Sequence, residues 1–180
     1  MSDTVFILLF RGVGGKTQLP TKPLREKLGE AGFDKVATYI NSGNAIVRTS
    51  LGREQVVDRV ADLCAKEFGF EKPIYAVSRA EWMDVIANNP FPDAVELGNL
   101  LHAAWLAEEP KPGAVETLRT FAKGGERVAV VGNAAYLHTP NGFGRSKLAE
   151  KFDTGIGVPN TARNWNTVLK LAELAKAVDG

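Results

Sequence analysis

Short apolar runs and amphipathic segments alternate along this chain, and glycine, proline and asparagine separate them. Val5–Phe10 is a continuous apolar run with branched and aromatic members, which predicts an interior strand covered on both faces. Residues 53–68 carry apolar side chains on one helical face, and Gly69 follows as a helix-ending glycine. The pattern therefore predicts a mixed chain of strands and helices.

Residues 1–79 contain predicted elements in the order β-α-β-β-α-β. They are strand Val5–Phe10, helix Pro23–Ala31, strands Val36–Ile40 and Ala45–Thr49 around a tight turn, helix 53–68 and strand Ile74–Val77. This order is that of the ferredoxin-like split β-α-β fold, an antiparallel sheet with two helices on one face. We expect this half to be a ferredoxin-like unit.

Residues 100–180 repeat the order at offsets of about 90 to 96 residues. The predicted elements are strand Leu101–Leu106, helix Pro112–Phe121, strands Arg127–Val131 and Ala135–His138, an insertion at 140–160, and a helix over 162–178 capped by Thr161. No last strand is evident in this half. We therefore expect an α+β protein of two ferredoxin-like halves with helices packed on antiparallel sheets, 1–79 and 100–180, joined by a helix and loop at 80–99.

Composition narrows the possible partners. The formal net charge of +1 gives no overall basic field, so a preference for nucleic acid or phosphate requires a local patch. A single cysteine, Cys64, falls on an apolar helical face, which fits a reducing cytoplasm. No signal peptide and no apolar stretch near the roughly 20 residues of a membrane span are evident. We expect a cytoplasmic protein without a membrane partner.

Two stretches indicate an anion site. Residues 11–16 form a glycine-rich loop with two cations directly after the first strand, and residues 161–166 crowd polar side chains around a predicted helix start. Backbone N–H groups at a helix start and in a glycine-rich loop favour oxyanions. The predicted anion ligands, with the hairpin 41–44 and the basic turn at 146–147 included, are Arg11, Gly14, Gly15, Lys16, Asn41, Ser42, Asn44, Ser146, Lys147, Arg163, Asn164 and Asn166.

Other chemistries find less support in the sequence. A nucleoside-triphosphatase loop requires a glycine where Phe10 stands, five residues before Gly15, and Pro20 delays the following helix. His102 and His138 lie on predicted strands without metal-ligand spacing, so we expect structural histidines, no metal and no cofactor.

Several strings resemble the DUF1697 family of uncharacterised bacterial proteins. They are the Arg11–Lys16 loop, Thr38–Asn44, Asn89-Pro90-Phe91, Ser146-Lys147-Leu148 and Thr161–Thr167, spread over nearly the whole chain. The first loop is shorter here than the family's usual Arg-Gly-Ile-Asn-Val-Gly-Gly. The resemblance implies an α+β fold of ferredoxin-like character and supplies no catalytic residues.

The leading hypothesis for function is binding of a phosphate-bearing small molecule, nucleotide or nucleic acid, where loop 11–16, hairpin 41–44 and helix start 161–166 converge. One alternative is an enzyme acting on a small anionic substrate with Ser42 or Ser146 taking part. Another is a structural or interaction module without a small-molecule ligand. The sequence leaves the oligomeric state open.

Overall fold

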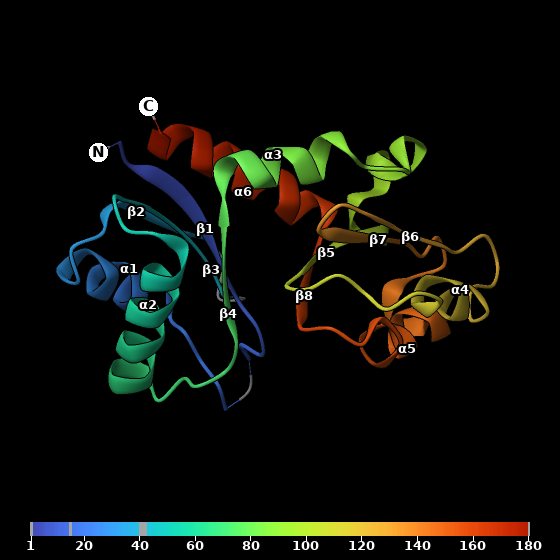
Figure 1. Cartoon of the computed structure of the whole chain (residues 1–180), viewed down its shortest axis with the longest axis horizontal. Coiled ribbons are helices and arrows are strands. Elements are labelled where there is room, and N and C mark those ends of the chain that lie inside the picture. Colours follow the sequence, from blue (N-terminus) through green and yellow to red (C-terminus); the bar gives the residue numbers. More distant parts are fainter. Residues whose placement is uncertain (1, 15, 40–42, 180) are drawn as a thin grey trace. The chain divides into compact units, whose positions relative to one another are not determined.

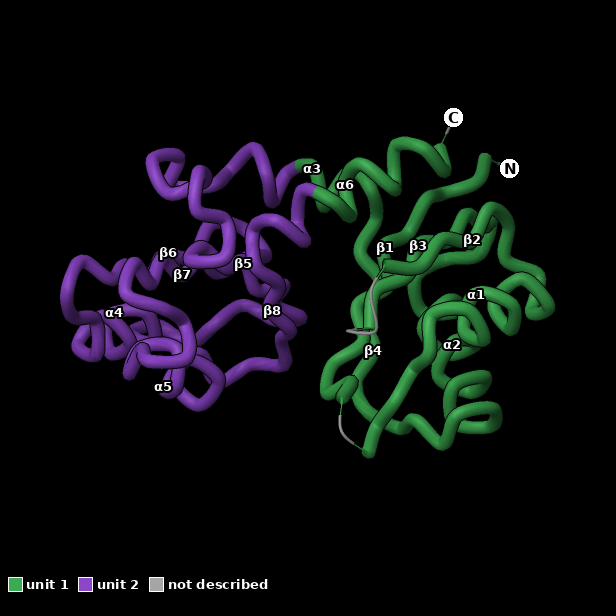
Figure 2. The backbone as a smooth tube through the Cα atoms, turned by 180° about the vertical axis from the view of Figure 1, so that it is seen from behind, with its two compact units in different colours: residues 1–83, 170–180 green, residues 84–169 purple. Residues whose placement is uncertain are grey.

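The computed structural model describes residues 2–14, 16–39 and 43–179. The chain divides into two compact units, residues 1–83 with 170–180 (unit 1) and residues 84–169 (unit 2). Figure 2 colours the two units, and two helices, α3 and α6, each carry residues of both. This division assigns residues 84–99 to unit 2 and residues 170–180 to unit 1.

Unit 1 contains the predicted order of elements (Figure 1). They are β1 (Thr4–Phe10), α1 (Thr21–Glu30), β2 (Asp34–Tyr39), β3 (Asn44–Thr49), α2 (Arg53–Phe68), β4 (Ile74–Ser78) and the first part of α3 (Arg79–Ala87). The sheet order is β2-β3-β1-β4, with every neighbouring pair antiparallel. This is the ferredoxin-like arrangement, and the predicted interior position of β1 is confirmed.

The core of unit 1 lies between the sheet and the helices α1 and α2. Side chains alternate across a strand, so one face of β1 presents Phe6, Leu8 and Phe10 to the helices. The fully buried residues that meet them include Leu24, Leu28, Val56, Val60 and Cys64. The other face of β1, with Val5, Ile7 and Leu9, is also buried, as its continuous apolar run predicts.

Unit 2 follows the same plan. It contains η1 (Pro92–Leu100, a kinked 3-10 segment), β5 (Leu101–Leu106), α4 (Ala114–Arg119), β6 (Arg127–Val131), β7 (Ala134–His138), η2 (Phe143–Arg145), α5 (Lys147–Ile156), β8 (Asn160–Asn164) and the first part of α6 (Trp165–Asp179). The sheet order β6-β7-β5-β8 is again fully antiparallel. Its helix-facing core joins Ala104 and Leu106 to Leu118, Leu148 and Phe152.

Backbone hydrogen bonds outside the ladders match between the units. Phe10 N donates to Gly43 O over 2.9 Å in unit 1, and Leu106 N donates to Asn133 O over 2.8 Å in unit 2. Likewise Arg11 N donates to Pro73 O over 3.0 Å, and Ala107 N donates to Pro159 O over 2.9 Å. Each pair joins the end of the first strand to the hairpin turn or to the residue before the last strand. The predicted duplication therefore extends to the backbone at this end of each sheet.

The start of the last helix differs from the sequence prediction. Residues 160–164 form strand β8, the last strand that the sequence did not show, and α6 begins at Trp165. Asn164, not Thr161, caps this helix, because its Oδ1 accepts a hydrogen bond from Thr167 N over 3.0 Å. In unit 1, α3 follows β4 in the same way, and Ser78 Oγ accepts from Glu81 N over 3.2 Å.

The Asn89-Pro90-Phe91 string has a structural role in unit 2. Asn89 Oδ1 accepts a hydrogen bond from Phe91 N over 2.9 Å, and the guanidinium of Arg127 lies 4.4 Å from the centre of the Phe91 ring. Arg127 also bonds both carboxylate oxygens of Asp93 and contacts His138 Nδ1 at 2.9 Å. Its hydrogen bonds lower the pKa of Asp93. These contacts hold the connecting segment against β6.

Candidate functional site

The glycine-rich loop of unit 1 lies where β1 ends. Gly12 has φ of +80° and Gly14 has φ of +139°, both in a region that side chains rarely adopt. Gly14 and Thr17 exchange backbone hydrogen bonds of 2.7 and 2.9 Å, and Thr17 Oγ1 adds a third to Gly14 O over 3.2 Å. Lys16 is exposed in the tight turn that these bonds close. The described residues of the loop therefore combine an exposed lysine with two glycines of positive φ.

A second cation reaches this loop from the segment before β4. Because Arg11 N is bonded to Pro73 O, the residue before this proline comes next to the loop. A side chain at Gly12 would lie 3.4 Å from Cγ of Lys72, so the aliphatic part of Lys72 packs over that glycine. Arg11, Gly12 and Lys72 are therefore neighbours. Sequence reasoning missed Lys72, because only the pairing of β1 with β4 brings it here.

The hairpin between β2 and β3 meets the same loop. A Cβ at Gly43, where φ is +81°, would lie 2.6 Å from Cγ2 of Val13, so this glycine allows the close approach. Asn44 is 1% exposed, and its Nδ2 donates to Tyr39 O over 3.4 Å within the hairpin. The predicted site residues Gly15, Asn41 and Ser42 lie outside the described residues. Within unit 1, Gly43 of the hairpin therefore lies against Val13 of the loop.

The predicted residues of the basic turn in unit 2 have structural contacts. Ser146 is 6% exposed, and its Oγ accepts a hydrogen bond from Ala149 N over 3.0 Å, so it caps α5. Lys147 is exposed and lies 3.9 Å from Glu150. The hydroxyl of Ser146 is therefore committed to this helix cap.

The stretch 161–166 also belongs to unit 2, and its polar side chains separate. Arg163 pairs with Ala103 and Asn164 with His102 on β5, so the two side chains point to opposite faces of the sheet. Arg163 Nη1 donates to Thr161 Oγ1 over 2.7 Å and to Ala162 O over 2.8 Å. Asn164 caps α6, as described above.

Asn166 packs against the backbone of Gly98 in unit 2. A Cβ at Gly98 would come within 2.2 Å of Asn166 Oδ1, so no larger residue fits there without a shift. The ligand role that the sequence assigned to Arg163, Asn164 and Asn166 stays a prediction. Arg163 hydrogen-bonds to residues of β8, Asn164 caps α6, and Asn166 packs on Gly98 of η1.

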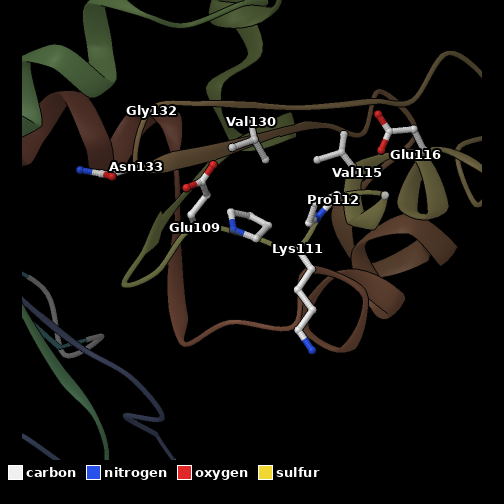
Figure 3. A pocket seen from close by; sticks show the side chains of 10 residues that line it. Glu109, Lys111, Pro112, Val115, Glu116, Val130, Gly132 and Asn133 are labelled. Atoms are coloured by element: carbon white, nitrogen blue, oxygen red, sulfur yellow. The ribbon is translucent and has the colours of Figure 1, made fainter.

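The loop of unit 2 that corresponds to loop 11–16 differs from it in charge, because it carries two carboxylates. The position of Arg11 is taken by Ala107, and the position of Lys72, directly before the matching proline, is taken by Val158. Gly12 corresponds to Glu108, and a second carboxylate, Glu109, follows. A cleft of about 690 Å³ opens beside this loop, and Figure 3 shows the side chains that line it. It is lined by Glu109, Pro110, Lys111, Pro112, Gly113, Val115, Glu116, Val130, Gly132 and Asn133.

His102 occupies the helix-facing side of β5 near η2. Its ring stacks on Phe143 with the centroids 4.0 Å apart, and its Nδ1 is buried without a hydrogen-bond partner among the described residues. Burial lowers the pKa of His102 to about 4. This histidine is therefore neutral near pH 7 and part of the packing.

Within the described ranges, no three histidine, cysteine, aspartate or glutamate side chains gather as a metal site would require. Over the same ranges, no helix combines the length and the apolar character of a membrane span.

The fold and the loop motifs define a class of small α+β proteins built from two ferredoxin-like repeats. A family model described as "Protein of unknown function (DUF1697)" matches residues 4–136, so the chain belongs to this family. A conserved bacterial protein, SP0830 from Streptococcus pneumoniae, has a similar structure, with a TM-score of 0.77 and 20% identity over 97% of this chain and 99% of that chain. At this identity the likeness shows the fold alone.

Two further comparisons add nothing to this assignment. Protein BT0572 from Bacteroides thetaiotaomicron is 11% identical over 97% of this chain and 96% of that chain, and its TM-score of 0.21 is too low to support a shared arrangement. No curated protein matches the sequence.

Proposed function

We propose that this protein binds a phosphate-bearing ligand, a nucleotide or nucleic acid, at the loop end of unit 1, where the loop after β1 meets Lys72. The cations of the site are Arg11, Lys16 and Lys72, and Gly12 and Gly14 let a ligand approach the backbone between them. Arginine and lysine beside a glycine-rich turn suit an oxyanion, because charge and backbone N–H groups act together.

One observation carries this proposal. Unit 2 builds the same backbone connection with Ala107 where unit 1 has Arg11, and with Val158 where unit 1 has Lys72. The fold therefore requires no cation at either position. Unit 1 thus carries two cations at positions where the repeated fold accepts alanine and valine, and an anionic ligand would use both. Since the net charge is only +1, this local patch and not the whole chain would attract the anion.

The enzyme alternative has weaker support. Ser146 uses its hydroxyl to cap α5, and Ser42 lies outside the described residues.

A cytoplasmic location remains part of the proposal. Its support is the single cysteine, Cys64, which is fully buried and whose pKa burial raises to about 12, so that it is an unreactive core thiol.

Thermal unfolding with inorganic pyrophosphate, ATP or a short single-stranded RNA tests the proposal. A ligand at 100 times its dissociation constant should stabilise the wild type by about 2.7 kcal/mol. The double variant Arg11→Ala/Lys72→Ala should bind at least about tenfold more weakly, because two charge-assisted contacts are lost. Each variant is compared with its own ligand-free melting temperature, which removes any effect of Arg11 on folding.

The matched control is Lys66→Ala, which removes an exposed lysine of α2 in the same unit. It should leave ligand stabilisation unchanged. Equal stabilisation of the wild type and the Arg11→Ala/Lys72→Ala variant by every probe, or no stabilisation of the wild type by any of them, would remove the basis of the proposal.

A further inference from the structure

The outer edge of β6 in unit 2 has free backbone hydrogen-bonding groups. β6 is an edge strand, because the sheet order is β6-β7-β5-β8. Gly132 and Asn133 form its two-residue turn to β7, so Val131 and Ala134 close the turn as a hydrogen-bonded pair. Residues alternate in the direction of their N–H and C=O groups, so those of Val130 point away from β7.

A side-chain contact supports this direction. Arg119 Nε donates to Val128 O over 3.3 Å, which requires that the carbonyl of Val128 also points to the outer edge. Arginine thus covers the edge at Val128. No described residue covers the N–H and C=O of Val130, two positions further along. An uncovered edge of this kind can accept another strand.

The cleft of about 690 Å³ opens directly beside this edge. Val130 projects into it from β6, and Pro110, Pro112 and Val115 line it from the loop and α4. Figure 3 shows Glu109 and Glu116 on either side of this apolar strip, while the Lys111 side chain runs away from both carboxylates. Neither glutamate forms an ion pair with another described residue. The cleft therefore combines apolar walls with two available negative charges.

We propose that β6 binds an extended peptide segment of a partner protein, which adds a strand at Val130 and places a basic side chain in the cleft. Backbone hydrogen bonds to Val130 would supply the alignment, as in other cases of strand addition. Two residues that lie opposite each other on paired strands have their side chains on the same face of the sheet. The peptide residue opposite Val130 would therefore place its side chain in the cleft. Glu109 and Glu116 favour lysine or arginine there.

The charges decide between the possible occupants. A neutral or acidic segment would meet two carboxylates without a counter-charge, whereas a basic segment pairs with them. A second copy of this chain pairing β6 with β6 would place the four glutamates of the two clefts along one joint edge. The basic peptide is therefore the occupant that the cleft fits. This site is in unit 2 and is independent of the proposed anion site in unit 1.

Amide NMR spectra of the full chain test the proposal with two blocked pentapeptides, one alternating valine with lysine and one alternating valine with glutamate. The lysine peptide should shift the Val130 amide saturably and bind at least about tenfold more tightly than the glutamate peptide, and added salt should weaken it. The double variant Glu109→Gln/Glu116→Gln should remove this preference. Glu96→Gln, an exposed glutamate of the same unit, should not.

A backbone variant tests the strand addition separately. Val130→Pro removes an outward N–H and none of the N–H groups bonded to β7, and proline is tolerated at a sheet edge, so the ladder to β7 stays complete while peptide binding is lost. Equal binding of both peptides, or no shift of Val130 up to about 5 mM of the lysine peptide, would overturn the proposal. So would a wild-type dimer that Val130→Pro converts to a monomer, because a second copy would then occupy the edge.

Discussion

Truncation of Leu8 to alanine is expected to lower the free energy of unfolding by about 2 to 5 kcal/mol. Leu8 is fully buried on the interior strand β1, on the face that packs against α1 and α2. The substitution removes buried methyl groups and leaves a cavity that the neighbouring side chains only partly fill. Urea unfolding monitored by circular dichroism measures the change.

Met83→Ala provides the control for Leu8. Met83 also belongs to unit 1 but its side chain is 43% exposed, so its truncation should cost less than about 0.5 kcal/mol. If Leu8→Ala costs as little as the control, Leu8 is not buried in the core, and the interior position of β1 is wrong.

Stability is expected to fall by about 2 kcal/mol between pH 7 and pH 5 because of His102. Burial lowers the pKa of this histidine to about 4 in the folded state, while the unfolded state has the ordinary value of about 6.5. Within this window the unfolded state binds the proton more readily, so protonation favours unfolding. The contribution of neutral His102 to the free energy of unfolding is complete above about pH 6.5. It is lost as the pH falls and changes no further below about pH 4.

The variant His102→Phe should flatten this pH dependence, because it keeps a ring against Phe143 and removes the titrating group. His138→Gln is the control. The pKa of His138 is lowered by burial and by Arg127, but this histidine is less buried, so it should account for a smaller part of the slope. An unchanged slope in His102→Phe would show that His102 does not titrate as its burial implies.

Much of the fold was readable from the hydrophobic pattern. The run Val5–Phe10 predicted an interior strand, and the apolar face of residues 53–68 predicted a helix; the structure confirms both. These elements are readable because burial on both faces or on one helical face leaves a period in the sequence. The order β-α-β-β-α-β then restricts the topology to few choices.

The missing strand shows where the pattern fails. β8 is made of Asn160, Thr161, Ala162, Arg163 and Asn164, and only one of these five is apolar. Its polar side chains bond one another and cap the next helix, so it has neither the alternation nor the apolar content of a typical strand. The helix predicted over 162–178 therefore includes residues 162–164, which belong to β8.

The candidate site was readable in part. The glycine-rich loop was recognised from Arg11 to Lys16, and the structure shows that it meets the hairpin at Gly43. Lys72 could not be found, since nothing in its sequence neighbourhood marks it and strand pairing alone brings it to Gly12. The contrast with Ala107 and Val158 was equally hidden, because equivalent positions emerge only when matching hydrogen bonds align the two units.

Amide NMR mapping of inorganic pyrophosphate binding to the wild-type chain tests whether the anion site lies in unit 1. We expect saturable shifts of the amides of Gly12, Gly14 and Lys72 in unit 1, and none at the equivalent loop of unit 2, from Ala107 to Gly113. Shifts of equal size in both loops, or shifts confined to unit 2, would contradict it, because the ligand would then not depend on the cations that distinguish the loop end of unit 1.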